Sequence, residues 1–252
     1  MKLKKIAEII ERAFPLSTAY EWDNCGILLG DGEREISRAL ISLDVNNAVL
    51  AEAISVNADL ILSHHPILFD GMKKITADNA EGRLISGLLE NKIAVYAAHT
   101  NCDVGETGIN ARLADIFGLL CAEPLEENGL GRIGNLVAPM AFAEFAELTK
   151  KLLNTPFVRV CGDKNAAVKR VAVASGACSD SIPTAILKGA DVIVTADMKY
   201  HEMINYSEEG IFIIDAGHYP TEIVVLDIFS ELLKNSGLTL IKSKNPDIFE
   251  VI

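Results

Sequence analysis

Ala58-Asp59-Leu60-Ile61-Leu62-Ser63-His64-His65-Pro66 is the stretch that decides the fold, because in it a short apolar run ends abruptly in two adjacent histidines. An apolar run of this length before a polar turn is typical of a buried strand. In open α/β sheets, ligands gather at the carboxyl ends of such strands. The sequence therefore predicts that His64 and His65 lie at a strand end where a ligand can bind.

The same pattern recurs in the second half of the chain. Ala58 to Ser63 matches Ala190 to Thr195, and the following segment from Ile93 to His99 matches Phe212 to His218. Each half thus has an Ala-Asp strand with a polar cluster after it, and a His-x-x-x-acid pattern after the next strand. The repeat predicts two related half-folds that face each other and bring these strand ends into one cleft.

Strands alternate with helices along most of the chain, which indicates largely parallel sheets covered by helices. Region 121–135 concentrates Pro, Gly and Glu and is the best internal boundary. We therefore expect a first α/β half over residues 1–124 and a second over residues 125–252. This division allows terminal segments to be exchanged between the halves.

Composition narrows the class of protein. The net charge of -12, with 23 scattered Lys and Arg residues, argues against a broad nucleic-acid surface. The apolar runs are far shorter than a membrane span, and the N-terminus lacks an apolar signal core. Five cysteines without a CxxC pair fit reduced thiols. We expect a soluble, cytoplasmic protein that binds neither membranes nor nucleic acid.

The histidines of the chain all lie in the strand-end segments. They are His64, His65, His99, His201 and His218. The companion carboxylates Asp103, Asp197 and Glu222 lie at strand ends or helix starts, where a helix N-terminus keeps them ionised. Neutral imidazoles with carboxylates and no thiolate suit Zn, Mn, Fe, Co or Ni.

This set offers more ligands than one catalytic zinc ion needs, so the sequence predicts two divalent metal ions per chain. A carboxylate can bridge them. Two such ions lower the pKa of a shared water toward neutrality and stabilise the charge that develops when it attacks, which favours hydrolysis as the reaction class. The rival interpretation is a buried His/carboxylate network that only stabilises a domain interface.

Other chemistries have weaker support. The chain contains no GxxxxGK[ST], GxGxxG or GxSxG motif. Cys102 beside His99 is an alternative nucleophile with its base. The lysine pair at 73–74 is expected to be solvated, or to contact an anionic substrate. Trp22, followed by the turn signal at 23–24, is a further site candidate, although a core anchor and a turn also explain it.

Five motifs, in this order, resemble the family labelled type 2 GTP cyclohydrolase I, also named after NGG1-interacting factor three. They are Trp22-Asp23-Asn24-x-Gly26, Ser63-His64-His65-Pro66-x-x-Phe69, His99-Thr100-Asn101-x-Asp103, Thr195-x-Asp197-x-Lys199-Tyr200-His201 and Asp215-x-Gly217-His218-Tyr219-x-x-Glu222. The resemblance spans nearly the whole chain. It implies two similar α/β domains with mixed, largely parallel sheets packed face to face around a metal cleft, and a hexameric toroid.

Carried over residue by residue, the resemblance implies a set of metal ligands. These are His64, His65, Asp103, His218 and Glu222. Glu222 would bridge, with His65 and Asp103 on one metal and His64 and His218 on the other. The catalytic candidates would then be His99 and His201, as acid, base or substrate contact.

The sequence departs from the family pattern at two positions, because Ala196 and Cys178 stand where glycines are expected. This bears on the geometry of the two loops that contain them. Longer members of the family carry an inserted domain between the halves, for which the linker at 121–135 leaves no room.

The predicted function is that of a metal-dependent hydrolase, either opening the imidazole ring of GTP or acting on another nucleotide or phosphorylated small molecule. The alternative is a non-catalytic metal-binding or regulatory scaffold. In either case the expected assembly is a cytoplasmic homohexamer, and for the hydrolase the expected substrate is small and anionic.

Overall fold

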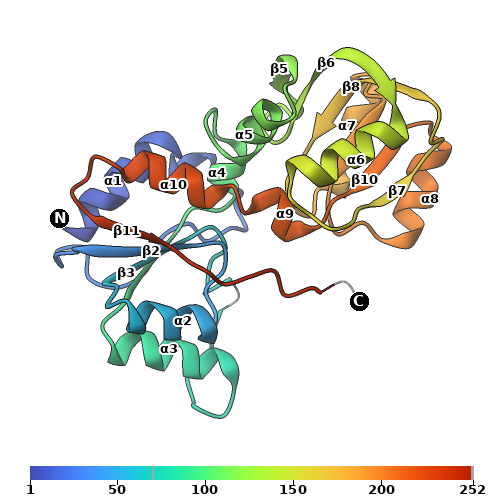
Figure 1. The fold of residues 1–252 in the computed structure, drawn as a ribbon. Helices are drawn as coiled ribbons and strands as arrows, with labels where there is room; N and C mark the ends of the chain where they lie inside the picture. The colour runs from blue at the N-terminus through green and yellow to red at the C-terminus, as the bar shows by residue number, and fades with distance from the viewer. Residues whose placement is uncertain (70, 251–252) are drawn as a thin grey trace. The chain divides into compact units, whose positions relative to one another are not determined.

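The computed structural model describes residues 1–69 and 71–250, and Figure 1 shows its elements. The chain divides into two compact units. The first consists of Met1–Cys102 and Val225–Asp247, and the second of Asp103–Val224 with the residues from Ile248. Each unit is an α/β fold built on one mixed sheet.

The first unit contains a five-stranded sheet in the order β1-β4-β3-β2-β11. The bounds are Gly26–Leu29 for β1, Arg38–Ser42 for β2, Leu60–Ser63 for β3, Ala94–Ala97 for β4 and Thr239–Lys242 for β11. β4, β3, β2 and β11 are parallel to one another, and β1 pairs antiparallel with β4. The sheet is therefore mixed but largely parallel.

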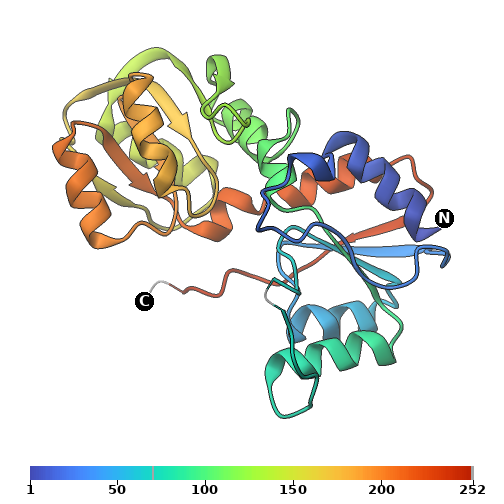
Figure 2. The same ribbon diagram turned by 180° about the vertical axis from the view of Figure 1, so that it is seen from behind.

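Helices cover both faces of this sheet, as the two opposite views show (Figures 1 and 2). The helices are α1 (Leu3–Ala13), α2 (Asn47–Ser55), α3 (Ala80–Glu90) and α10 (Val225–Leu233). α2 and α3 pack on one face, where buried apolar side chains such as Val49 and Leu88 meet Ile61 of β3. On the other face, Phe14 after α1 and Phe229 of α10 have ring centroids 6.4 Å apart.

The second unit contains a six-stranded sheet in the order β5-β6-β8-β9-β10-β7. The bounds are Leu120–Pro124 for β5, Arg132–Ala141 for β6, Arg159–Cys161 for β7, Ala167–Val173 for β8, Val192–Thr195 for β9 and Phe212–Asp215 for β10. β8, β9 and β10 are parallel, and the outer pairings are antiparallel.

Helices also flank the second sheet. They are α5 (Ile109–Ile116), α6 (Phe142–Leu152), α7 (Ile182–Leu187) and α8 (Tyr200–Glu208), with the shorter helix α9 (His218–Glu222) in the same unit. The short helix α4 (Thr100–Val104) contains the boundary between the two units. Ile182 and Ala185 of α7 are buried against Ile193 of β9. Phe142 of α6 and Phe212 of β10 have ring centroids 5.0 Å apart. Among the described residues, no helix combines the length and apolarity needed to cross a membrane.

The observed division of the chain differs from the expected boundary between residues 124 and 125. The Pro- and Gly-rich region is not a linker, because β5 pairs antiparallel with β6 inside the second sheet. The division instead falls between Cys102 and Asp103, shortly after β4 of the first sheet. The C-terminal segment then returns to the first unit, where β11 extends the sheet by pairing with β2.

The sequence repeat corresponds to a repeated structural device. Asp59 precedes β3 and accepts hydrogen bonds from the backbone N–H groups of Ser37 and Arg38, at 2.8 and 3.0 Å. Asp191 precedes β9 and accepts from Lys169 and Arg170 in the same way, both at 2.8 Å. Each aspartate thus holds the start of a central strand against the strand that precedes it.

We expect Asp59→Ala and Asp191→Ala each to lower the free energy of unfolding by about 1–2 kcal/mol, because each removes charge-assisted hydrogen bonds to two strand N–H groups. The midpoint of urea denaturation measures the effect. Glu127→Ala is the control, because Glu127 is exposed in the turn after β5. Equal midpoints for all three variants would contradict the role of the two aspartates.

Candidate metal centre

Three histidines meet at the carboxyl end of the first sheet. His64 and His65 follow β3 directly and His99 follows β4. The two strands are parallel neighbours with Ser63 opposite Ala97, so the residues after them emerge side by side. One ring nitrogen from each histidine lies within 4.8 Å of those of the other two. Such a group can hold one metal ion.

The Nδ1 atom of each of these histidines is already held by an oxygen of the same unit. His64 Nδ1 lies 2.8 Å from the carbonyl oxygen of Ala98, and His65 Nδ1 lies 2.7 Å from Asp44 Oδ1. His99 Nδ1 lies 2.8 Å from Asp23 Oδ1. A carbonyl or carboxylate on one ring nitrogen fixes the tautomer and orients the other nitrogen toward a metal. Nε2 is therefore the atom that each ring would present.

Asp23 is the most strongly held of these partners. Its side chain is fully buried, and burial alone would raise the pKa of Asp23. Hydrogen bonds from His99, Thr100 and Cys25 outweigh burial and hold the pKa well below its usual range. Burial raises the pKa of Cys25 to about 12, so the neutral thiol donates to Asp23 Oδ2 over 3.1 Å. Asp23 therefore stays ionised beside His99.

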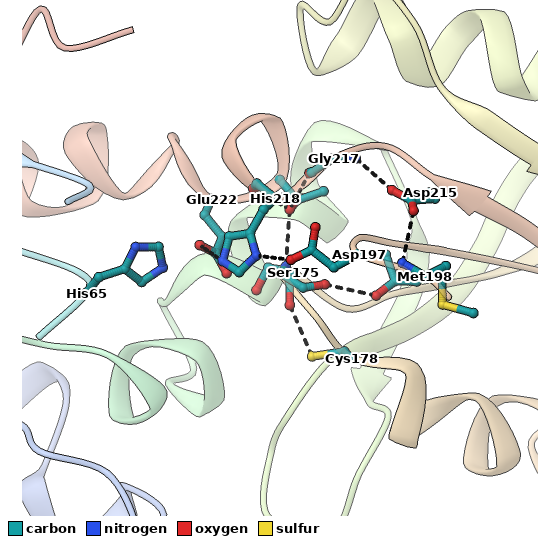
Figure 3. A network of polar contacts seen from close by, with 12 residues as sticks. His65, Ser175, Cys178, Asp197, Met198, Asp215, Gly217, His218 and Glu222 are labelled. Carbon is teal, nitrogen blue, oxygen red and sulfur yellow. Dashed lines mark hydrogen bonds and ion pairs between the residues drawn. The ribbon is translucent and has the colours of Figure 1, made fainter. Parts of the chain in front are cut away.

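A second cluster lies in the second unit, on the short helix α9 (Figure 3). His218 and Glu222 are one helical turn apart, and His218 Nε2 lies 2.9 Å from Glu222 Oε2. The other ring nitrogen of His218, Nδ1, lies 2.7 Å from Asp197 Oδ2. His218 thus repeats the arrangement of the first cluster, with a carboxylate on Nδ1 and with Nε2 directed at the ligand position.

Asp215, at the end of β10, binds the segment that contains Asp197 and the segment that contains His218. Its carboxylate accepts from the backbone N–H groups of Met198 at 3.0 Å and Gly217 at 3.1 Å (Figure 3). It also pairs with Arg159. Asp197 has a φ of +55°, a conformation that favours glycine, and it follows Ala196, where the family pattern has a glycine. The hydrogen bonds on both sides keep Asp197 in that conformation.

Glu222 is buried, with 4% of its surface exposed. The turn that follows β8 fits closely around its carboxylate. A Cβ atom built on Gly176 would overlap Glu222 Oε1, and Gly176 has a φ of +63°. The Gly176 N–H also donates to Thr221 Oγ1 at 3.1 Å, which ties the turn to α9. This glycine is therefore required both by its backbone conformation and by the space that Glu222 occupies.

Asp103 belongs to the second unit and borders the same turn. Ser175 Oγ donates to Asp103 Oδ1 at 3.3 Å, and Asn110 connects the two, accepting from the Ser175 N–H at 2.8 Å and donating to the Asp103 carbonyl at 3.1 Å. Burial, followed by the charges of Asp103 and Glu222, raises the pKa of Cys178 well above its usual range. The Cys178 thiol is therefore held in its neutral form, and its Sγ donates to the Ser175 carbonyl at 3.0 Å.

These contacts bear on three expectations. Asp103 was expected in the first half but lies in the second unit, because its side chain and backbone bond to residues around β8 and α5. His99 lies among the potential ligands His64 and His65, with ring centroids 5.1 and 5.6 Å away. Cys102 is fully buried, which rules it out as a nucleophile for an incoming substrate.

His201, the other predicted catalytic residue, is exposed near the start of α8, and its ring contacts Tyr200. Sequence reasoning missed two of the acids that orient the histidines, because Asp44 is not among the predicted site residues and Asp23 is identified only with a turn. For Asp44 the available signal is its position, since it lies just after β2, beside β3, as Asp197 lies just after β9, beside β10.

The donor set of both clusters fits a divalent transition metal. In each cluster the potential ligands are imidazole nitrogens or carboxylate oxygens. A carboxylate or a carbonyl oxygen binds the other ring nitrogen of each histidine and so fixes its orientation. Such outer partners are characteristic of metal-binding histidines. Fold and donor chemistry together define a class: an α/β protein of two sheets whose strand-end histidines and carboxylates can bind metal ions.

Comparison with known proteins narrows this class. The model of the DUF34/NIF3 family (NGG1p interacting factor 3) matches residues 1–247. A Clostridium perfringens protein named "GTP cyclohydrolase 1 type 2 homolog" is 38% identical over 262 residues, covering 100% of both chains. The chain belongs to the DUF34/NIF3 family, as the sequence motifs predicted.

Solved structures agree with this assignment. A Bacillus cereus protein related to NIF3 matches with a TM-score of 0.94 and 25% identity, over 100% of this chain and 99% of the other. Reduced HcgD from Methanocaldococcus jannaschii matches with a TM-score of 0.88 and 35% identity, over 97% and 98% of the two chains. The predicted α/β fold with two mixed sheets is confirmed.

We expect Gly176→Ala to displace Glu222 and to lower the affinity for divalent metal at least tenfold, which is the effect of disturbing a ligand's support. Competition with a chromogenic chelator measures it. Gly189→Ala is the matched control, because Gly189 has a φ of +72° and an added Cβ meets nothing within 4 Å. Both variants carry a left-handed backbone penalty of about 1–2 kcal/mol, so equal metal affinities would show that the Gly176 turn does not support the site.

Proposed function

We propose that this protein is a metal-dependent hydrolase with a dinuclear divalent-metal centre. The proposed ligands are those that the family resemblance implies, namely His64, His65, Asp103, His218 and Glu222. The observation that carries the proposal is that His64, His65 and His218 each have Nδ1 on an oxygen, so that Nε2 is the nitrogen that each ring offers to a metal. Burying polar groups in this way costs free energy, and side chains that only packed the protein interior would not need to be polar.

Zn, Fe, Mn, Co and Ni all suit the donor set, since it consists of imidazole nitrogens and carboxylate oxygens. Two such ions would supply Lewis-acid chemistry, which acidifies a water molecule and stabilises developing negative charge. The chain's own residues supply orientation: Asp44 holds His65, and Asp197 holds His218. Glu222 is the proposed bridging ligand, and the Gly176 turn leaves room for its carboxylate.

His99 is the proposed group that moves protons. Ionised Asp23 on Nδ1 keeps the proton at that nitrogen, so Nε2 is the atom that accepts a proton or donates it to substrate. His201, exposed on α8, is the second proposed acid, base or substrate contact.

The proposed substrate is a nucleotide or another small phosphorylated molecule, with ring opening of GTP as one candidate reaction. The support is the name shared by relatives that are 35–38% identical, "GTP cyclohydrolase 1 type 2 homolog". The hexameric assembly and the cytoplasmic location implied at the sequence level stay predictions.

A metal-binding or regulatory scaffold is the second candidate function. It is favoured by the complete burial of His64 and near-complete burial of Glu222, since closed, buried ligand sets are typical of structural metal sites. In this case the metals contribute to folding stability instead of to turnover.

One experiment separates the two candidates. The metal-reconstituted protein is assayed against a panel of nucleotides and phosphoesters, and elemental analysis of the same sample is expected to give about two metals per chain. We expect turnover to fall at least a thousandfold in the His65→Ala/Glu222→Ala double variant, because it lacks a ligand from each cluster. If the double variant equals the wild type on every substrate, hydrolysis at this centre is wrong. A large loss of melting temperature with chelator and no turnover would establish the scaffold instead.

The role of His99 can be tested separately. His99→Gln keeps a polar side chain but cannot take up a proton at Nε2. We expect a loss of about 10²–10⁴ in kcat, the usual contribution of general acid–base catalysis, with metal content unchanged. If metal content falls in parallel with activity, His99 is a third ligand of the His64/His65 group and not a proton carrier.

A further inference from the structure

Two aromatic rings, Trp22 and Phe69, contact His99 in the first unit, and a third, Tyr20, stacks on Trp22. The indole ring of Trp22 stacks on Tyr20 with centroids 5.4 Å apart and lies 5.6 Å from the ring of Phe69. Trp22 and Phe69 both contact the imidazole of His99 edge-on, at 6.2 and 6.3 Å. Despite these contacts, Trp22 is 58% exposed and Phe69 is 50% exposed. We call Tyr20, Trp22 and Phe69 the aromatic shelf.

The exposure of Trp22 does not come from a loose loop, because the residues around it are anchored. The Tyr20 N–H donates to Thr100 Oγ1 at 3.0 Å. The neighbouring Asp23 accepts from His99 and from the Thr100 N–H at 2.8 and 3.0 Å. Asn24 Nδ2 donates to the Leu68 carbonyl next to Phe69. The loop is thus bonded both to the segment after β4 and to the segment after β3.

A single exposed aromatic residue needs no explanation, since soluble proteins expose much apolar surface. Here, however, hydrogen bonds fix two half-exposed rings and a stacked third ring against a histidine of the candidate metal centre. Planar rings stack on exposed aromatic faces that are held in this way. Such surfaces accept any nucleobase, because every nucleobase has a π-face.

We propose that the aromatic shelf binds the planar heteroaromatic ring of the substrate, so that the ring lies beside His99. The proposal rests on the proposed function and narrows its substrate class, from small phosphorylated molecules in general to those that carry a purine-like ring. Trp22 and Phe69 supply the stacking faces. Because Asp23 holds Nδ1 of His99, Nε2 is the nitrogen of His99 that would bond to a heteroatom of that ring.

Trp22 is the only tryptophan of the chain, so tryptophan emission reports on this shelf alone. The metal-reconstituted protein is titrated with guanosine 5′-monophosphate, and separately with ribose 5-phosphate, which carries the same phosphate but no base. We expect saturable quenching by the nucleotide and no response to the sugar phosphate. Equal responses to the two, or none to either, would overturn the proposal.

Variants test the stacking contribution directly. In equilibrium dialysis with labelled guanosine 5′-monophosphate, we expect Trp22→Ala to weaken binding about tenfold, the effect of losing one base–aromatic stack. Trp22→Phe keeps an aromatic face and should stay within about threefold of the wild type. Phe157→Ala is the matched control, since Phe157 is 45% exposed in the second unit. If Trp22→Ala binds like the wild type, or if Trp22→Phe is as weak as Trp22→Ala, the shelf is not a stacking site.

This test can fail independently of the proposed function. Metal content is measured for each variant, and we expect it to be unchanged in Trp22→Ala. If the protein hydrolyses a phosphoester without an aromatic ring and nucleotide does not quench Trp22, the hydrolase proposal stands and the proposed role of the aromatic shelf is wrong. Nucleotide quenching that survives in a protein without bound metal or activity would retain the shelf as a binding site and remove the hydrolase.

Discussion

Parallel pairing of neighbouring strands is the constraint on which both ligand clusters depend. Because β3 and β4 run in the same direction and in register, the residues that follow them emerge at one edge of the sheet. β9 and β10 do the same in the second unit. Residues far apart in sequence, such as His64 and His99, or Asp197 and His218, therefore become neighbours without any loop having to reach across the fold.

The next requirement is that the histidine rings have a fixed orientation. Acidic side chains and one backbone carbonyl provide it by binding Nδ1 of each ring. A histidine at a strand end can rotate about two side-chain bonds, and a hydrogen bond to Nδ1 removes this freedom while it selects the tautomer. Asp44, Asp23 and Asp197 each serve one histidine. Asp23 has a second role, because it also anchors the backbone of Thr100 and thereby the loop that presents Trp22.

Much of the fold could be predicted from local patterns. The helices α1, α2, α3 and α6 and the central strands β3 and β9 follow from apolar periodicity. The side chain of Asn46 caps α2 by accepting from the Ala48 and Val49 N–H groups. β5 and β6 could not be predicted in this way, because Pro and Gly between them resemble a linker and only the antiparallel pairing makes the region a hairpin. The short helices α4 and α9 are also hard to predict from local patterns, since five residues carry little periodic signal.

For the candidate site, the sequence by itself determined which residue types gather at the strand ends, because a buried apolar run followed by polar residues dictates where the chain leaves the sheet. The sequence also determined the family, because the five motifs occur in the order that the family shows. Only the tertiary structure decided which acid serves which histidine, that Asp103 belongs with Ser175 and Asn110, and that Gly176 makes room for Glu222. These relations join residues from separate strands and loops, and they depend on strand register and side-chain direction, which no local pattern encodes.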